Sequence, residues 1–397
     1  MSTQPELRFP DFTQEYEHKT IKDIATICLG LTYTPDYVEE GVIFISSKDI
    51  ANDYLDLTDV KYISQEEFDN STSNAKPQRG DILFTRVGSN LGHPVIVETD
   101  IPLCMFVSLG FLRITDENVS NEYVKHWMNT DSFWNQIKRK TAGGAKVNIN
   151  TGWLKDFDIF LPPIEEQNKV AQMLNKMDEL ITTMTKEIEE LVIIRSGVVQ
   201  GIFCQEIKVD GDYADWEEDE ISNYIEEYTV KTTTNNEYPI LSSTKNGIVL
   251  QSEYFNKQTA STDTTGYKIV PNGYFTYRSM SDTGDFYFNQ QNLIDAGIVS
   301  PAYPVFKATN IDSQYLYYML NESDYIKSQI LLLKEGGTRF ALSMQKLKKL
   351  TLLVPTSEEQ QKIVECIASF DKLLEIKKQK LATCKEIKQG LLQKMFV

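Results

Sequence analysis

Two segments of the chain carry the same hydrophobic pattern, with apolar residues at alternating spacings of four and three. This spacing places them on one face of a helix, at the a and d positions of heptads. Each pattern begins after a proline, and a Glu-Glu pair follows where its charge favours the positive end of the helix dipole. We therefore predict two long helices, at about 163–204 and 356–397. The residues expected to pair them are Val170, Leu174, Met177, Ile181, Met184, Ile188, Leu191 and Val198 in the first, and Ile363, Ile367, Phe370, Leu374, Leu381 and Leu391 in the second.

Neither apolar face can be buried by one helix alone, so we expect the two helices to pack on each other. Burial of each apolar side chain contributes about 1.5–3 kcal/mol. Basic residues interrupt both faces, at Arg195 in the first helix and at Lys377 and Lys388 in the second. A helix of roughly 40 residues is about 60 Å long, so it can act as a ruler. Ser357 followed by Gln360 suggests a capping box at the second start.

The two helices belong to a longer repeat. Residues 143–203 align without a gap with residues 336–396, at a constant offset of 193. A long-period duplication indicates two copies of one architectural unit, and two copies suggest a bipartite target. The matched positions include Pro162/Pro355, Glu166/Glu359, Gln167/Gln360, Asp178/Asp371, Gly197/Gly390 and Phe203/Phe396.

Weaker matches extend the repeat toward the N-terminus, since Tyr16 aligns with Trp216 and Tyr123 with Tyr315. The layout is therefore body, connector, body, connector, and the bodies have diverged more than the connectors. We predict the boundaries 1–160, 161–205, 206–354 and 355–397.

The bodies have the pattern of mixed α/β domains. Short runs rich in β-branched and aromatic residues, bounded by Gly, Pro and Asp, predict strands at 42–45, 81–85, 94–97 and 111–114. Helical patterns cover Tyr123–Ile137 and Gln314–Leu333, and Gly-Gly pairs at 143–144 and 336–337 are expected to end them. The fold class is α+β, with two tandem domains that are each followed by a long helix.

Composition narrows the class of protein. The 397 residues lack an apolar run long enough to span a bilayer, so we expect a cytoplasmic protein without a membrane partner. Five scattered cysteines and three scattered histidines argue against a disulfide framework or a metal site. The net charge of −17 disfavours nucleic acid as a partner, although basic residues cluster locally.

Glu-Glu-Gln opening a long helix after a short strand that ends in proline occurs twice, at Leu161–Gln167 and Val354–Gln360. This doubled pattern resembles the specificity subunit of type I restriction-modification systems, and Pro5–Phe12 resembles the N-terminus of many bacterial members. The resemblance implies two target-recognition domains, each reading one half of a split double-stranded DNA site. It implies that the helices pack as an antiparallel coiled coil, set the unread gap and carry two modification subunits. Those subunits bind S-adenosylmethionine and methylate adenine, and restriction subunits with motor and nuclease activity join them.

Candidate DNA-binding residues lie beside the Gly-Gly pairs and at two strand ends. Gly-rich turns let the backbone approach a phosphate, and basic side chains neutralise it. The same basic residues would also favour the C-terminal end of a helix dipole. An arginine at a strand end could bind guanine through two hydrogen bonds, or form a structural ion pair. The candidates are Lys138, Arg139, Lys140, Lys146, Lys334 and Arg339 near the turns, and Arg86 and Arg278 at the strand ends.

No catalytic motif stands out. The sequence lacks a Gly-x-x-x-x-Gly-Lys-Ser/Thr loop, the Asn/Asp-Pro-Pro-aromatic tetrad of adenine methyltransferases and a serine hydrolase motif. We expect a non-catalytic reader with no cofactor or metal of its own. The alternatives are a coiled-coil scaffold that binds only proteins, which the acidic charge favours, and a stand-alone DNA-binding nuclease.

Overall fold

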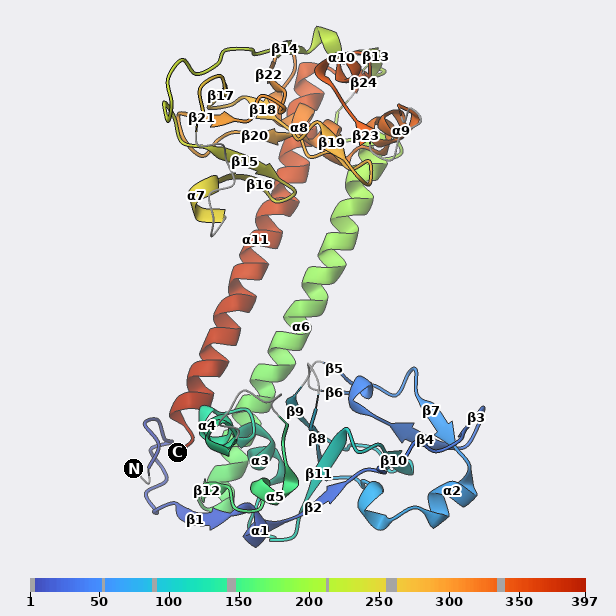
Figure 1. Ribbon diagram of the computed structural model, residues 1–397, viewed down its shortest axis with the longest axis vertical. Helices are drawn as coiled ribbons and strands as arrows, with labels where there is room; N and C mark the ends of the chain where they lie inside the picture. Colours follow the sequence, from blue (N-terminus) through green and yellow to red (C-terminus); the bar gives the residue numbers. More distant parts are fainter. Residues whose placement is uncertain are drawn as a thin grey trace. The chain divides into compact units, whose positions relative to one another are not determined.

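The computed structural model describes residues 4–51, 54–87, 91–140, 148–211, 214–254, 263–333 and 340–397 (Figure 1). The chain divides into two compact units. Unit 1 holds residues 1–185 and 379–397, and unit 2 holds residues 186–378. This division runs through both long helices, so each unit contains one body and one part of each helix.

Unit 1 contains a mixed α/β body, and its elements before the first long helix are mostly short. Of the expected strands, 42–45 is found as predicted, and the others differ by a few residues at their ends. The elements are β1 (Glu17–Thr20), α1 (Ile21–Ile24), β2 (Ala25–Leu29), β3 (Tyr37–Val38), β4 (Val42–Ile45), η1 (Ser47–Asp49), β5 (Ile50–Ala51), β6 (Tyr54–Leu55), β7 (Lys61–Ile63), α2 (Gln65–Asn70), η2 (Ser73–Ala75), β8 (Ile82–Thr85), β9 (Gly92–Ile96), β10 (Leu103–Met105), β11 (Leu109–Ile114), α3 (Asn121–Trp127), α4 (Asp131–Lys140), α5 (Thr151–Leu154), β12 (Asp158–Leu161) and α6 (Ile164–Phe203).

Unit 2 contains the second body, and the second long helix α11 starts there and ends in unit 1. The remaining elements are β13 (Glu217–Glu220), η3 (Ile221–Asn223), β14 (Ile225–Glu227), β15 (Leu241–Thr244), β16 (Gly247–Leu250), α7 (Gln251–Tyr254), β17 (Lys268–Pro271), β18 (Phe275–Thr276), β19 (Met280–Ser281), β20 (Asn289–Gln290), β21 (Ala296–Val299), β22 (Val305–Ala308), α8 (Ser313–Glu322), α9 (Asp324–Leu332), β23 (Phe340–Ala341), α10 (Met344–Leu347), β24 (Thr351–Val354) and α11 (Ser357–Lys394).

The same frame recurs in both bodies. Unit 1 has an antiparallel sheet in the order β2-β11-β8-β9, and unit 2 has one in the order β14-β22-β18-β20. The turns before β8 and β18 contain Gly80 and Gly273, whose φ angles of 91° and 81° favour glycine. A second pair of strands holds each frame to its long helix. Glu17 pairs with Leu161 across β1-β12, and Glu217 pairs with Val354 across β13-β24, in the same antiparallel register.

What surrounds the frame differs between the bodies. Unit 1 adds a second sheet in the order β10-β4-β7-β3, in which β10 runs parallel to β4. Unit 2 instead adds the strand pairs β15-β16 and β17-β21. The repeat predicted from the sequence is therefore a repeat of the frame, with unlike attachments.

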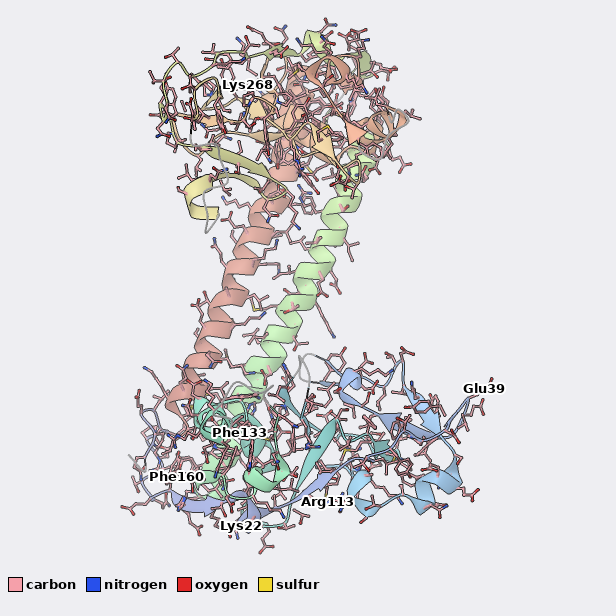
Figure 2. All side chains as sticks on the ribbon, in the orientation of Figure 1. Lys22, Glu39, Arg113, Phe133, Phe160 and Lys268 are labelled. Atoms are coloured by element: carbon pink, nitrogen blue, oxygen red, sulfur yellow. The ribbon has the colours of Figure 1, made fainter. Side chains whose placement is uncertain are left out.

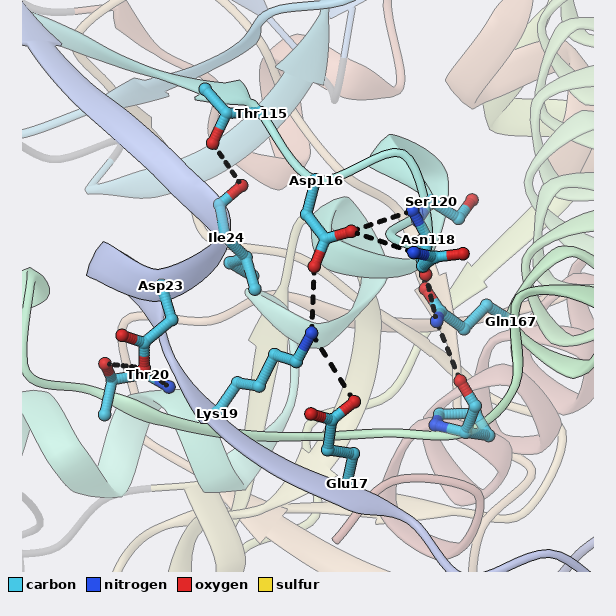
Figure 3. Close-up of polar contacts among 11 residues, drawn as sticks. Glu17, Lys19, Thr20, Asp23, Ile24, Thr115, Asp116, Asn118, Ser120 and Gln167 are labelled. Atoms are coloured by element: carbon cyan, nitrogen blue, oxygen red, sulfur yellow. Dashed lines mark hydrogen bonds and ion pairs between the residues drawn. The ribbon is translucent and has the colours of Figure 1, made fainter.

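A buried glutamine joins each body to the start of its long helix. In unit 1 the side chain of Gln167 donates to the Pro162 and Asn118 carbonyls at 2.8 and 2.9 Å, and accepts the Ser120 N–H at 2.9 Å (Figure 3). In unit 2 the matched Gln360 donates to the Pro355 carbonyl and accepts the Asp312 N–H, at 2.9 and 2.8 Å. Because Ser120 and Asp312 occupy the N-cap positions of α3 and α8, this contact fixes a body helix against a long helix.

The predicted body helices are each broken in two, which corrects the continuous helices expected at Tyr123–Ile137 and Gln314–Leu333. The breaks fall at Thr130 and Ser323, whose hydroxyl groups accept backbone N–H groups of the following helix. Capping by Ser or Thr competes with helix continuation, because it satisfies donors that would otherwise lack a partner. After its break α4 packs into the core through Phe133 (Figure 2), whose ring lies 5.0 Å from that of Trp127.

The start of α11 also differs from the expected capping box. The hydroxyl of Thr356, one residue before Ser357, accepts the Glu359 N–H at 3.3 Å. The Gln360 side chain is turned to the body, as described above, because an unsatisfied carbonyl at buried Pro355 would cost more than an exposed helix end. None of the helices described here has the length and apolar character needed to cross a membrane.

Replacing Gln360 by methionine should lower the free energy of unfolding by about 2 kcal/mol, because the Pro355 carbonyl and the Asp312 N–H both lose a partner. The neighbouring Gln361 is exposed, so Gln361→Met should change that free energy by less than about 0.5 kcal/mol. Chemical denaturation of both variants measures the difference. Equal effects would contradict a joining role for Gln360.

Candidate functional site

The residues predicted to pair the long helices lie inside both units, and each is buried or half-buried. Six of them are less than 10% exposed: Val170, Leu174, Ile188, Ile363, Ile367 and Leu374. The other eight are half-buried: Met177, Ile181, Met184, Leu191, Val198, Phe370, Leu381 and Leu391.

The ends of the long helices belong to the cores of the bodies. In unit 1 Val170 and Leu174 share a hydrophobic cluster with Leu392 in the last turn of α11 and with Phe396, which follows the helix. The ring of Phe396 lies 4.7 Å from that of Tyr123. In unit 2 Ile363 and Ile367 share a cluster with the last turn of α6, where the ring of Phe203 lies 6.1 Å from that of Tyr315. The same aromatic contact therefore recurs at the repeat offset. Each body packs on the start of one long helix and on the end of the other.

The helices are antiparallel, as contacts within each unit show. In unit 1 the sulfur atoms of Met184 and Cys384 lie 3.9 Å apart, and Asp178 forms an ion pair with Lys388. In unit 2 Glu187 forms an ion pair with Lys377 at 2.7 Å, and Arg195 forms one with Asp371 at 2.5 Å. The partner number falls as the α6 number rises, which is the antiparallel arrangement.

The basic residues that interrupt the hydrophobic pattern therefore pair with acids on the other helix. Two of the ion pairs are copies of each other, since Asp178 matches Asp371 and Lys388 matches Arg195 at the offset of 193. The sequence indicates this contact only through the aspartate that is repeated at positions 178 and 371. The partner of each basic residue could not be identified without the helix register.

Arg195 is the most extensively bonded of these residues. Its guanidinium forms two further hydrogen bonds to the carboxylate of Glu322, at 2.6 and 2.8 Å, and Glu322 lies at the end of α8. The bonds to Glu322 and, second, to Asp371 raise the pKa of Arg195 against the opposing effect of burial. The hydroxyl of Tyr318 donates to Asp371 at 2.8 Å. One arginine thus joins α6 to α11 and to the body of unit 2.

The two arginines predicted to read bases have different surroundings. Arg86 follows β8, and its side chain donates to the carbonyls of Ile149 and Val107 at 3.1 and 3.0 Å. It is half-buried, and burial lowers the pKa of its guanidinium. These bonds hold two chain segments together. The geometry therefore favours a structural role for Arg86 over hydrogen bonding to a base.

Arg278 follows β18 and is exposed, with no hydrogen bond or ion pair to any residue in the described ranges. It lines a pocket of about 330 Å³ together with Lys245, Ser243, Thr283 and Tyr287. Tyr287 is 43% exposed, which leaves an aromatic face next to the two cations. Asp282 and Asp285 also line the pocket, so it has two basic and two acidic residues and is not positive as a whole. Its arginine, lysine, hydroxyl and aromatic groups are of the kinds that proteins use on nucleic acids.

The remaining candidates divide into two sets. Lys138, Arg139 and Lys140 are exposed in the last turn of α4, where they also favour the helix dipole. Lys146, Lys334 and Arg339 lie outside the described residues, as do both Gly-Gly pairs. The structure thus places one basic cluster and one arginine pocket at the surfaces of the bodies.

Replacing Arg195 by methionine should lower the free energy of unfolding by about 2 kcal/mol, because the carboxylates of Glu322 and Asp371 lose a charged partner in a site where Arg195 is only 16% exposed. Lys377→Met is the matched control. Its ion pair with Glu187 is more exposed, so the loss should stay below about 1 kcal/mol. Denaturant titrations of the two variants test this order, and a larger loss for Lys377→Met would overturn it.

Proteins of known sequence are similar to this chain over most of its length. The type I restriction enzyme MjaVIII specificity subunit of Methanocaldococcus jannaschii is 23% identical over 345 residues, covering 79% of this chain and 77% of that protein. Another protein of the same organism, MjaX, is 24% identical over 413 residues, covering 96% of this chain and 93% of its own length.

Solved structures share the fold. The S subunit of a type I restriction-modification system from M. genitalium has a TM-score of 0.57 at 16% identity, and the match covers 99% of both chains. A chain from a type I R-M system solved in a study of complex assembly has a TM-score of 0.61 at 16% identity, covering 96% of this chain and 97% of that chain.

The family model of the type I restriction modification DNA specificity domain matches the chain twice, over residues 13–192 and 214–386. Each match includes one body and most of the long helix that follows it, as the repeated frame requires. The chain therefore belongs to the family of type I restriction-modification DNA specificity subunits.

Proposed function

We propose that this chain directs a type I restriction-modification enzyme to a DNA site with two unlike halves, one for each body. The observation that carries the proposal is a repeated frame with unrepeated attachments. The sheets β2-β11-β8-β9 and β14-β22-β18-β20 match, whereas the second sheet of unit 1 has no counterpart in the strand pairs β15-β16 and β17-β21. The repeated frame would hold the two bodies against DNA in equivalent ways. Because the attachments give the bodies unlike surfaces, the bodies would contact unlike base sequences.

Specific binding needs groups that contact phosphates and groups that contact base edges. In unit 2 the pocket of Arg278 supplies both kinds, because an exposed arginine can form two hydrogen bonds to guanine and Lys245 can neutralise a phosphate. In unit 1 the exposed end of α4, from Lys138 to Lys140, supplies phosphate contacts. The basic cluster at the end of α4 would favour phosphate binding locally, although the net charge of the chain is −17.

The long helices would set the unread gap between the half-sites. α6 is a continuous helix of 40 residues, so it is about 60 Å long, compared with 34–36 Å for one turn of B-DNA. The duplicated ion pairs and the joining glutamines limit sliding of the helices within each unit. A fixed helix length then translates into a fixed number of unread base pairs.

Matched apolar side chains on the long helices support two copies of one partner. In unit 1 Leu180 and Ile387 are 45% and 50% exposed, and in unit 2 their matched residues Leu373 and Ile194 are 42% and 54% exposed. In both units the isoleucine adjoins the basic residue of the duplicated ion pair, and the leucine follows its aspartate by two positions. We assign these two surfaces to two modification subunits, since identical partners need matching contacts.

Catalysis would then belong to the partners. Modification subunits that bind S-adenosylmethionine would methylate adenine, and restriction subunits would supply the motor and nuclease activities. This chain would only position the partner subunits on the DNA site, without a cofactor of its own. The competing functions, a protein-only scaffold and a stand-alone nuclease, find no parallel among the relatives described above.

Mapping of methyladenine in genomic DNA tests the proposed function. Co-expression of this chain with its modification subunit should produce a split motif with unlike halves, and the motif should be absent when this chain is omitted. Arg278→Ala should relax the motif in one half only, because Arg278 belongs to the body of unit 2. A motif that does not depend on this chain, or a complex that produces no motif, would contradict the assignment.

Substitutions on the helix surface test the docking of partners. Leu373→Asp combined with Ile194→Asp should reduce the bound modification subunits from two to one, because a charge replaces apolar contact at one of the two matched surfaces. Lys372→Asp is the control, since it places the same side chain on the exposed neighbour. Native mass spectrometry measures the stoichiometry, and retention of two partners by the double variant would exclude this surface.

A further inference from the structure

A buried glutamate opens each long helix, and in unit 1 it holds an arginine. The Glu166 side chain is only 1% exposed, and its carboxylate accepts the Nε–H and Nη2–H groups of Arg8 at 2.9 and 2.8 Å. The hydroxyl of Tyr16 donates to the same carboxylate at 3.3 Å, and the Arg8 guanidinium lies over the Tyr16 ring, 5.0 Å from its centre. A carboxylate and an aromatic ring thus form a complete site for one guanidinium.

The described part of unit 2 contains the same carboxylate and aromatic ring, and none of its cations binds them. The matched Glu359 is 5% exposed, and its Oε1 accepts the indole N–H of Trp216 at 2.9 Å, where Trp216 stands in the place of Tyr16. The other oxygen, Oε2, has no hydrogen-bond partner among the residues that the structure describes. A carboxylate oxygen buried in this way is costly unless a cation or a donor reaches it.

A small pocket lies next to this carboxylate. Its volume is about 70 Å³, and its lining includes Glu359, Trp216, Ile202, Ile363 and Lys208. Since about 10–15 Å³ of such a cavity already holds one water molecule, the pocket has room for a planar guanidinium or an ammonium head group. Its two aliphatic side chains and the indole suit a weakly hydrated cation, and tryptophan is the best aromatic partner for one.

The segment that carries Arg8 in unit 1 has a counterpart in unit 2, and it does not fill the pocket. The Leu7 N–H donates to the Lys394 carbonyl at 2.8 Å, and the Ile207 N–H donates to the Gly201 carbonyl at 2.9 Å, with Gly201 at the repeat position of Lys394. Because Leu7 and Ile207 form equivalent bonds, the residues that follow them, Arg8 and Lys208, occupy equivalent positions in the two units. Lys208 is nevertheless exposed and forms no ion pair with Glu359, and a lysine cannot reproduce the two parallel bonds of a guanidinium.

We propose that Glu359 and Trp216 form a binding site for the guanidinium of an arginine side chain that another protein supplies. The proposal follows from the filled copy in unit 1, the unpaired oxygen of Glu359 and the size of the pocket. It assigns to the start of α11 a contact that is separate from the apolar docking surfaces. The contact is independent of the DNA-binding role, since no residue of the Arg278 pocket lines it.

Titration of the full chain with methylguanidinium tests the site. The chain contains four tryptophans, and ¹⁵N labelling of their indoles gives one resonance for Trp216, which Trp216→Phe identifies. That resonance should shift and saturate with methylguanidinium, because its N–H is bonded to the carboxylate that the probe contacts. Methylammonium at the same ionic strength should bind at least tenfold more weakly. An absent shift, or equal binding of the two cations, would overturn the proposal.

Four variants separate the possible occupants. Glu359→Gln should abolish the shift, whereas Glu358→Gln, on the exposed neighbour in the same turn, should preserve it. Lys208→Arg supplies a guanidinium from the chain itself and should weaken probe binding at least tenfold, which tests the site without changing the glutamate. Binding that survives in Glu359→Gln, or in Lys208→Arg at full strength, would refute the site. Binding that appears only in Lys208→Met would assign the pocket to Lys208 and exclude an arginine from another protein.

Discussion

The ring contact between Tyr123 and Phe396 in unit 1, and its copy between Tyr315 and Phe203 in unit 2, hold each body to the C-terminal end of a long helix that begins in the other unit. Neither body can therefore complete its hydrophobic core with its own helix alone. The start of one helix and the end of the other must lie side by side, and this requirement fixes their antiparallel direction. The apolar side chains between the long helices, the joining glutamines and the duplicated ion pairs then determine the register at which the antiparallel helices meet.

Much of the frame could be predicted because side-chain pattern and helix geometry share one period. The apolar residues predicted to pair the two long helices are all buried or half-buried. An apolar face that is repeated over several heptads is buried when a second helix packs along it. The breaks at Thr130 and Ser323 could not be found in the same way, because a short hydroxyl side chain inside a helical pattern continues or caps the helix depending on its neighbours. In the sequence Arg195 and Lys388 only interrupt the apolar pattern, because the acids that pair with them lie far away along the chain.

The candidate site was less accessible to prediction than the frame. Arg86 and Arg278 hold similar places after a glycine-led strand, yet one bonds to two backbone carbonyls and the other is open to solvent. The difference arises from the segments around each strand end, where the bodies have diverged. Glu359 shows the reverse case. Its sequence match to Glu166 is complete, and only the three-dimensional contacts reveal that one carboxylate has its arginine and the other does not.

The duplicated ion pair has a consequence for the history of such chains. Asp178 and Arg195 lie on the same helix. Asp178 contacts Lys388, which is the repeat match of Arg195, and Arg195 contacts Asp371, which is the repeat match of Asp178, so a single helix carries both halves of the contact. A shorter ancestor with one body and one helix would be self-complementary, and two identical copies could associate about a twofold axis with their helices antiparallel. Such a dimer would be confined to palindromic sequences. Joining the two copies in one polypeptide removes that restriction, because each body can then change its surface without changing the other.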